Sequence, residues 1–303
     1  MSQAIKAWIS ASRPRTLPLA AASILMGGFL ASFNGVFRWS IFLLTLSTTL
    51  LLQILSNLAN DFGDYQHGAD HQGRVGPSRM VQSGAISPGK MKKVIMGVAL
   101  ITLILGIYLL TESVGIERPS FYLLLALGIL SIAAAVKYTA GKKPYGYSGW
   151  GDLSVVIFFG LVAVLGTYFL QTSTIQWDIL LPALSCGLFA TAVLNVNNIR
   201  DIESDAQAGK LSIPVRIGRE QAVLYHWFLI GAGMAFSVVY VLIHYISPWQ
   251  WLFLAVLPLL YRNGKAVSTK TGKALDPYLK QMALTTLAYV ITFGLGLMVA
   301  GSM

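Results

Sequence analysis

The chain has 303 residues, of which 55% are hydrophobic and only 11% are charged, and its mean hydropathy is +0.65. This composition excludes an ordinary soluble globular protein and indicates an integral membrane protein. The formal net charge of +10 does not call for a nucleic-acid partner, because anionic lipid headgroups also attract basic loops. The single cysteine, Cys186, lies in an apolar run and excludes a disulfide framework.

Charged and Gly/Pro-rich segments divide the chain into apolar stretches of spanning length, for which about 20 residues suffice. The first stretch follows a basic start but lacks a clear small-residue cleavage site, so we interpret it as a retained helix. The sequence predicts an all-α polytopic membrane protein with about nine transmembrane helices, in a single domain over residues 1–303. The expected spans are 15–33, 38–60, 92–111, 119–138, 153–171, 178–198, 221–244, 248–262 and 281–301.

The basic residues test this division, because Lys and Arg collect in cytoplasmic loops. Of the 22 Lys and Arg residues, only Arg38 and Arg118 fall on the side opposite the N-terminus. We therefore expect the N-terminus to be cytoplasmic and the C-terminus to lie on the other side.

Two acidic segments follow predicted spans on the basic side. The first reads NLANDFGDYQHGAD and includes Asp61 and Asp64, and the second reads NVNNIRDIESDAQAGK and includes Asp201 and Asp205. Both contain an asparagine followed four residues later by an aspartate, and in both the acidic residues are followed by glycine and a basic residue. This correspondence suggests two related halves that face each other around a central cavity.

The spacing of these aspartates indicates a cation site. Asp61 and Asp64 are three residues apart and Asp201 and Asp205 are four apart, so each pair lies on one face if its helix continues. A cation between them would relieve the repulsion, and all-oxygen ligands favour Mg²⁺. Two facing sites would hold a diphosphate. Alternatively, the carboxylates only solvate helix ends, and the asparagines next to them only cap those ends.

The two segments resemble the aspartate-rich motifs of the UbiA superfamily of intramembrane prenyltransferases. The stretches RPRTLPLA, RVGPSRMVQSGAIS and KYTAGKKPYGYSGWGDLSVVIFFGLVAVLGTYF are similar to its 1,4-dihydroxy-2-naphthoate polyprenyltransferase branch. The resemblance covers nearly the whole chain. Two positions depart from the family pattern. Gly68 stands where the superfamily motif has its third aspartate, with Asp70 two residues later, and Ser212 stands where threonine is frequent.

The resemblance implies transfer of a polyprenyl group from polyprenyl diphosphate to 1,4-dihydroxy-2-naphthoate, with loss of CO₂ and diphosphate, giving demethylmenaquinone. It implies that Asp61 and Asp64 bind one Mg²⁺ and that Asp201 and Asp205 bind another. Asparagines would act as supporting ligands or would orient these aspartates: Asn57, Asn60, Asn197 and Asn198. Basic residues would neutralise the diphosphate oxygens: Arg79, Arg200 and Lys210. The protein would lie in the inner membrane of a bacterium, among membrane lipids and without a nucleic-acid partner, with its active site open to the cytoplasm.

Several aromatic and basic residues allow two interpretations. Tyr138, Tyr145 and Tyr147 either shield a carbocation with their ring faces or belong to an interfacial aromatic belt. Lys142 or Lys143 either steers the acid group of the naphthoate or is an ordinary juxtamembrane lysine. Arg13 likewise is either substrate-facing or an anchor at the cytoplasmic surface.

Asp152 begins the fifth predicted span, where we expect an N-cap rather than an acid or base. His67 and His71 are four residues apart, but no zinc site is expected there because no further ligands are near.

Two rival functions stay open. Another enzyme of the same fold would use 4-hydroxybenzoate or homogentisate as acceptor. A cation-coupled transporter would also carry acids in repeated halves, but such acids normally lie in the middle of broken spans. Here the acidic segments follow the apolar runs.

Overall fold

The computed structural model describes residues 2–68, 76 and 79–302. This part of the chain consists of helices and connecting loops and contains no β-strand, so the all-α prediction is confirmed. Asp70 and His71, about which the sequence raised questions, lie outside the described residues.

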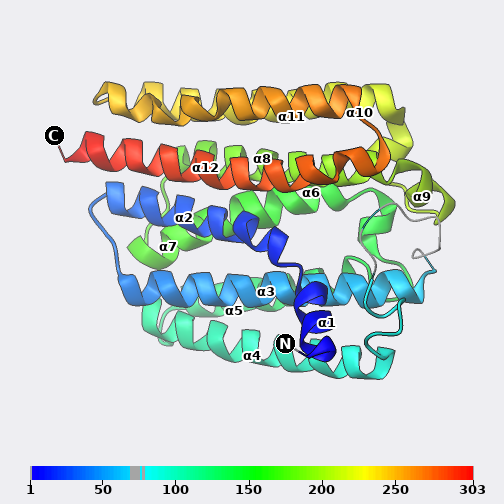
Figure 1. The fold of residues 1–303 in the computed structure, drawn as a ribbon. Coiled ribbons are helices and arrows are strands. Elements are labelled where there is room, and N and C mark those ends of the chain that lie inside the picture. Colours follow the sequence, from blue (N-terminus) through cyan, green and yellow to red (C-terminus); the bar gives the residue numbers. More distant parts are fainter. Residues whose placement is uncertain (1, 69–75, 77–78, 303) are drawn as a thin grey trace.

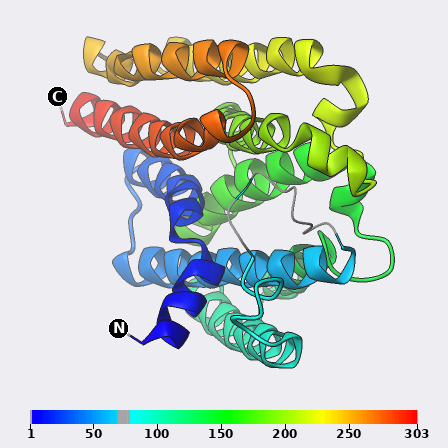
Figure 2. The same cartoon turned by 45° about the vertical axis from the view of Figure 1, so that its right-hand side comes forward.

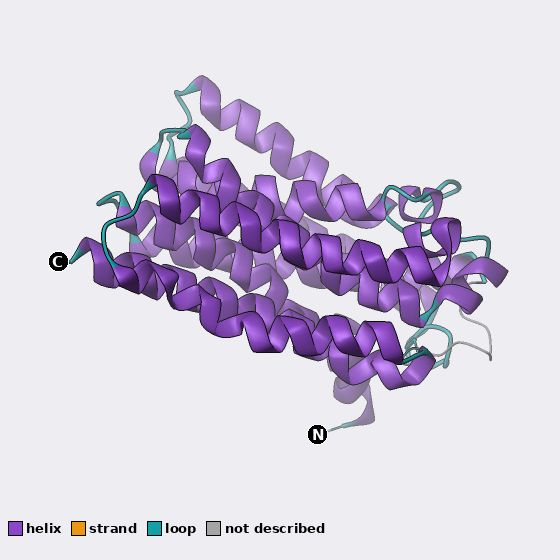
Figure 3. Cartoon of the chain, turned by 90° about the horizontal axis from the view of Figure 1, so that it is seen from above, coloured by secondary structure: helices purple, strands orange, loops and turns teal. Residues whose placement is uncertain are grey.

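The long helices run side by side along one direction (Figures 1 and 3). The first elements are α1 (Gln3–Ser12), η1 (Pro14–Thr16), α2 (Leu17–Phe33), α3 (Trp39–Gln66), α4 (Pro88–Ser113) and α5 (Pro119–Lys137). They are followed by η2 (Tyr145–Ser148), α6 (Gly151–Val155), η3 (Val156–Leu165), α7 (Gly166–Thr172), η4 (Trp177–Ile179) and α8 (Leu180–Arg200). The last are α9 (Ile202–Gln207), α10 (Ile213–Ile243), η5 (Pro248–Val256), α11 (Leu257–Thr269), η6 (Gly272–Leu275) and α12 (Asp276–Gly301).

Proline marks the first turn of many of these helices. Its fixed φ suits the start of a helix, where the missing N–H would have no partner in any case. The prolines at such positions include Pro14, Pro18, Pro88, Pro119, Pro214, Pro248, Pro258 and Pro277.

Eight helical segments of the described chain are long and apolar enough to cross a membrane. They correspond to all the predicted spans except the eighth. The helices that adjoin the acidic segments extend beyond the predicted apolar runs. α3 continues to Gln66 and α10 begins at Ile213, with an interruption at Gly218. The first acidic segment therefore begins as the polar last turns of α3.

The predicted eighth span is a composite. Residues 248–262 fall on the 3₁₀ segment η5 and the first part of α11, which Pro258 opens in its first turn. Together they return the chain along α10 to the start of α12 (Figure 1). Because neither part has the length of a spanning helix, the predicted count of nine is not confirmed. The two related halves also stay a prediction.

The fifth span contains an unusual helix. Between α6 and α7, the residues of η3 form a π-helix, a wider helix that is rare outside functional regions. Gly160 lets η3 approach α8 closely, because a Cβ at this position would lie 2.7 Å from the main-chain oxygen of Ala183. The π-helix thus lies directly against α8.

α8 is the central helix of the bundle. In the apolar stretch of the segment Trp177–Arg200, 72% of the residues are buried, compared with 11% in α5. α8 packs against α10, η3 and α12, whereas α3 packs against α4 and α5. In a membrane, the exposed apolar faces of α4 and α5 would contact lipid. The polar ends of α3 and α8 lie at the same end of the bundle (Figures 1 and 2).

Candidate active site

A cavity of about 270 Å³ lies between α2, α3, α5, η3 and α8. Eight of the residues predicted for the site line it: Asn57, Asn60, Asp64, Arg79, Tyr138, Tyr145, Asn197 and Lys210. Six others are not on its wall as the described residues define it: Asp61, Lys142, Asn198, Arg200, Asp201 and Asp205. Apolar side chains, among them Leu52, Phe158 and Phe159, line other parts of the wall. The cavity therefore combines a polar region with an apolar one.

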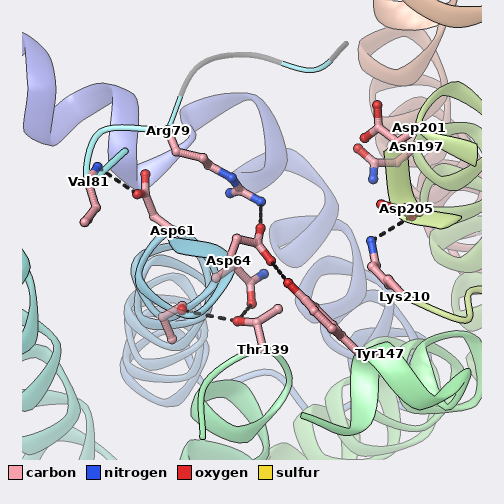
Figure 4. Close-up of polar contacts among 12 residues, drawn as sticks. Asp61, Asp64, Arg79, Val81, Thr139, Tyr147, Asn197, Asp201, Asp205 and Lys210 are labelled. Atoms are coloured by element: carbon pink, nitrogen blue, oxygen red, sulfur yellow. Dashed lines mark hydrogen bonds and ion pairs between the residues drawn. The ribbon is translucent and has the colours of Figure 1, made fainter. Parts of the chain in front are cut away.

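Asp64 lies between two donors on the cavity side of α3 (Figure 4). Arg79 forms an ion pair with its Oδ2, and the Tyr147 hydroxyl donates a hydrogen bond of 2.7 Å to its Oδ1. Arg79 and Asp64 are both buried, so water screens this pair weakly. Both carboxylate oxygens are thus held in a defined orientation.

Asp61 has a different environment, although it is only one helical turn away. Its two oxygens accept hydrogen bonds from the backbone N–H groups of Met80 and Val81, at 2.9 and 3.0 Å. The side chain is buried and holds the loop that carries Arg79. A role of Asp61 as a metal ligand stays a prediction.

The asparagines of α3 bind neighbouring segments. The Asn57 amide donates to the main-chain oxygen of Ser12 at 2.8 Å and to the Thr16 hydroxyl at 3.0 Å. Thr139 donates to Oδ1 of Asn60 at 2.9 Å. Both asparagines face the cavity while they attach the chain before α2 and the loop after α5 to α3.

Arg200 at the end of α8 is enclosed by oxygen acceptors. It donates to both oxygens of Asp201 at 2.8 and 2.6 Å, to Asp276 at 2.7 Å and to Asn197 at 2.9 Å. Its side chain is 1% exposed. Because Asp276 begins α12, Arg200 joins the end of α8 to α12, and its predicted contact with diphosphate stays a prediction.

Asp205 and Lys210 form the second ion pair that adjoins the cavity. Lys210 Nζ lies 2.9 Å from Asp205 Oδ2, and Lys210 lines the cavity. Burial raises the pKa of Asp205, Lys210 opposes this shift, and the negative charges of Asp201 and Asp64 add to it. The two acidic segments thus influence each other electrostatically across the site.

Two tyrosines form an aromatic part of the wall. Tyr138 and Tyr145 stack edge to face with ring centroids 5.3 Å apart, and burial raises the pKa of both hydroxyls. The Tyr145 hydroxyl lies 3.0 Å from the main-chain oxygen of Ala134, to which it donates. Lys142 and Lys143, in contrast, are exposed on the loop after α5.

Asp152 does not cap its helix. Trp150 occupies the N-cap position of α6, and Asp152 follows in the first turn, so the predicted cap is wrong. The Tyr225 hydroxyl donates to Asp152 Oδ1 at 3.2 Å. A carboxylate in the first turn still interacts favourably with the helix dipole.

The donor atoms suit a hard cation. The described residues contain no group of three or more His, Cys, Asp and Glu side chains that could enclose a metal. Oxygen donors are nevertheless concentrated here, because Asn57, Asn60, Asp64 and Asn197 all line the cavity. Mg²⁺ typically takes only one or two carboxylates and completes its shell with water and phosphate oxygens. The residues present therefore fit Mg²⁺.

His67, for which the sequence predicted no zinc site, contacts the main-chain oxygen of Gly141 at 2.8 Å.

The roles of several residues at this site could not be assigned from the sequence. Arg13, left between two interpretations, lines the cavity, and its left-handed backbone with φ of 48° directs the turn into α2. Tyr147 was named only for its ring, although its hydroxyl binds Asp64. Phe158 and Phe159 were not singled out, because an apolar stretch does not reveal which of its residues face a cavity.

The fold and the site define an integral membrane protein with a cavity suited to a ligand that has an anionic head and an apolar chain. Residues 20–284 match the model of the UbiA prenyltransferase family. The chain belongs to this family.

Curated relatives cover nearly the whole chain. A 1,4-dihydroxy-2-naphthoate octaprenyltransferase of Haemophilus influenzae is 42% identical, covering 99% of this chain and 98% of the relative. The enzyme of the same name from Escherichia coli is 41% identical, with coverage of 96% and 95%. Solved structures show the same fold. A UbiA homologue from Aeropyrum pernix has a TM-score of 0.67 at 17% identity, over 94% of this chain and 96% of that one. A homologue from Archaeoglobus fulgidus bound to GPP and Mg²⁺ has a TM-score of 0.59 at 16% identity, with coverage of 92% and 98%.

Proposed function

We propose that the protein transfers a polyprenyl group from polyprenyl diphosphate to 1,4-dihydroxy-2-naphthoate, releasing CO₂ and diphosphate and leading to demethylmenaquinone. The similarity to octaprenyltransferases over nearly the full chain supports the reaction. The single structural observation that supports it most directly is the cavity, in which acidic and basic side chains lie close to an apolar wall.

Arg79 and Lys210 would bind the diphosphate. Both line the cavity, and each now neutralises an aspartate, Asp64 or Asp205. Guanidinium and ammonium groups bind phosphate oxygens through charge-assisted hydrogen bonds. When the substrate binds, Arg79 and Lys210 would release their aspartates and bind phosphate oxygens instead.

Asp64 from α3 and Asp205 from α9 would hold Mg²⁺, with the neighbouring asparagines as neutral ligands. Asp201 would act through Arg200, which donates to both of its oxygens. Mg²⁺ would supply positive charge that stabilises the departing diphosphate. Asp61 would act through the loop that it holds, because both of its oxygens already accept backbone hydrogen bonds.

The apolar and aromatic walls would bind the prenyl chain. Phe158 and Phe159 of η3 would exclude water from the allylic carbon, and the ring faces of Tyr138 and Tyr145 would stabilise its developing positive charge. Breaking the allylic C–O bond sends its electron pair to diphosphate. This step needs no covalent nucleophile on the protein.

The acceptor would enter beside Arg13, whose guanidinium suits a carboxylate. The ring forms a C–C bond to the allylic carbon, and the carboxylate leaves as CO₂, returning its bonding electrons to the ring. These changes balance without an oxidant. The direct product is therefore the hydroquinone form of demethylmenaquinone.

Mass spectrometry of the lipid product tests this function. Purified protein would receive Mg²⁺, a polyprenyl diphosphate and 1,4-dihydroxy-2-naphthoate labelled in its carboxyl group. The labelled CO₂ that is released would be collected. We expect one CO₂ per prenylated product. A product that keeps its carboxylate would assign the protein to another acceptor, such as 4-hydroxybenzoate.

The site would open to the cytoplasm of a bacterial cell, since the basic loops lie at this end of the chain's predicted topology. Gln66 and Gln207 are exposed beside the two acidic segments. Single cysteines at these positions, in a Cys186→Ser background, should both react with a membrane-impermeant reagent from the cytoplasmic side. Labelling from opposite sides would contradict the two-segment site.

A further inference from the structure

Tyr147 reaches Asp64 from η2, in the loop after α5 (Figure 4). Its side chain is 9% exposed, and its hydroxyl donates the 2.7 Å hydrogen bond to Asp64 Oδ1. The ring packs near the His67 imidazole, with centroids 5.4 Å apart. Tyr147 is not on the cavity wall formed by the described residues. We therefore assign its hydroxyl to the Asp64 carboxylate and not to a substrate in the cavity.

The main chain around Tyr147 is attached to the second acidic segment. The Leu211 N–H donates to the Tyr147 carbonyl at 2.8 Å, and Arg216 donates to the Ser148 carbonyl at 2.6 Å. Gly149, with φ of 81°, permits this approach, because a Cβ there would lie 2.6 Å from Arg216 Cζ. One short loop thus contacts Asp64 on one side and the chain after Lys210 on the other.

The two partners of Asp64 differ in what substrate binding would do to them. Arg79 lines the cavity, so its guanidinium can turn toward phosphate oxygens. Tyr147 is not among the residues that line this cavity in the described part of the chain, so its hydrogen bond to Oδ1 can persist when Arg79 turns away. A carboxylate oxygen has two lone pairs, so Asp64 can accept this bond and still bind a cation.

We propose that Tyr147 is a positioning residue, whose hydroxyl orients the Asp64 carboxylate for a divalent cation and whose carbonyl ties it to the loop of the second acidic segment. Hydrogen bonds behind a ligand fix its orientation, and their loss typically weakens metal binding about 10- to 100-fold. This inference rests on the proposed function for the identity of the cation site, but its first test, a metal-binding measurement, needs no acceptor and no turnover.

The test is Mn²⁺ binding to purified protein, followed by electron paramagnetic resonance in the presence of pyrophosphate. Tyr147→Phe should raise the Mn²⁺ dissociation constant by roughly 10-fold or more. Tyr168→Phe is the matched control, since its buried hydroxyl accepts a 2.9 Å hydrogen bond from Asn34 at the opposite end of the bundle. We expect the control to bind Mn²⁺ like the wild type. Wild-type Mn²⁺ affinity in Tyr147→Phe would overturn the proposal.

Two further measurements separate positioning from structural support. Raising Mg²⁺ should restore the turnover of Tyr147→Phe, which a loosened fold would not allow. In an Asp64→Asn background, Tyr147→Phe should weaken Mn²⁺ binding by less than about twofold, because the partner of the hydroxyl is already altered. A full additional loss in this background would also overturn the proposal.

Tyr147→Met lacks the hydroxyl and packs differently, so it repeats the test if the Phe variant does not yield folded protein. Failure of the proposed function has a different signature. Protein that forms no prenylated naphthoquinone but loses Mn²⁺ affinity on Tyr147→Phe would refute the reaction and keep the positioning role.

Discussion

The two acidic segments have similar sequences but hold their aspartates in different ways. In the first, Asp61 accepts backbone hydrogen bonds from Met80 and Val81. In the second, Asp201 is bound by the buried guanidinium of Arg200. The other aspartate of each predicted pair, Asp64 or Asp205, pairs with a basic side chain that lines the cavity.

This comparison divides each predicted pair into two roles. Asp64 and Asp205 are paired with Arg79 and Lys210, which line the cavity and would bind phosphate in the proposed reaction. Asp61 and Asp201 are bound to parts of the fold that cannot easily leave: a backbone loop in one case, and a buried Arg joined to α12 through Asp276 in the other. Substitutions should therefore separate loss of metal-dependent activity from loss of stability.

Asp64→Asn should have the largest effect on turnover. Asn keeps the shape of the side chain but removes the charge, and a loss on the order of a hundredfold is expected when a metal ligand is neutralised. The measurement is turnover per folded protein at a series of Mg²⁺ concentrations.

Asp178→Asn is the control for Asp64→Asn, because Asp178 lies at the other end of the bundle. There its Oδ2 is 2.7 Å from Nε2 of His244. It should keep wild-type turnover. Full activity of Asp64→Asn at limiting Mg²⁺ would contradict a metal-binding role of Asp64. It would favour the alternative interpretation, in which the carboxylates of the first acidic segment only solvate the end of the helix.

Asp201→Asn should lower stability as well as activity. Removing one partner of a buried ion pair commonly costs about 3 to 5 kcal/mol, and the remaining contact of Arg200 with Asp276 should keep the cost near the lower value. Thermal unfolding in detergent would show this change. An unchanged unfolding temperature with lost Mg²⁺ dependence would make Asp201 equivalent to Asp64.

Asp61→Asn should cost less, about 1.5 to 3 kcal/mol, because only one amide oxygen remains to accept the two N–H groups. We expect a lower unfolding temperature and a Mg²⁺ dependence that shifts less than in Asp64→Asn. An equal shift would establish Asp61 as a direct ligand and remove the difference between the two aspartates.

Hydropathy and charge predicted the bundle well because spanning length and loop charge are local properties of the sequence. The predicted eighth span instead consists of η5 and the first part of α11, and Pro258 lies in the first turn of α11, where the two meet. The spacing of the acidic residues predicted Asp64 as a site residue, and the family resemblance added Asn197 and Lys210; all three line one cavity.

Partner choice could not be predicted in the same way. The contact of Tyr147 with Asp64 joins residues 83 positions apart, and Asp61 is held by main-chain groups that have no sequence signature. The acceptors that surround the Arg200 guanidinium, from α8, the α8–α9 junction and α12, were not predicted either. Such assignments depend on tertiary packing.

Asp152→Asn should have the smallest effect, and it tests whether a buried carboxylate near the site takes part in the reaction. The side chain is not on the cavity wall formed by the described residues, and its Oδ1 accepts a hydrogen bond from Tyr225. Asn can accept the same bond, so the loss is mainly the favourable interaction of a negative charge with the first turn of α6, worth up to about 1 kcal/mol. Turnover should stay within a few-fold of the wild type at all Mg²⁺ concentrations. A loss comparable to that of Asp64→Asn would give Asp152 a direct part in the chemistry and extend the site beyond the two acidic segments.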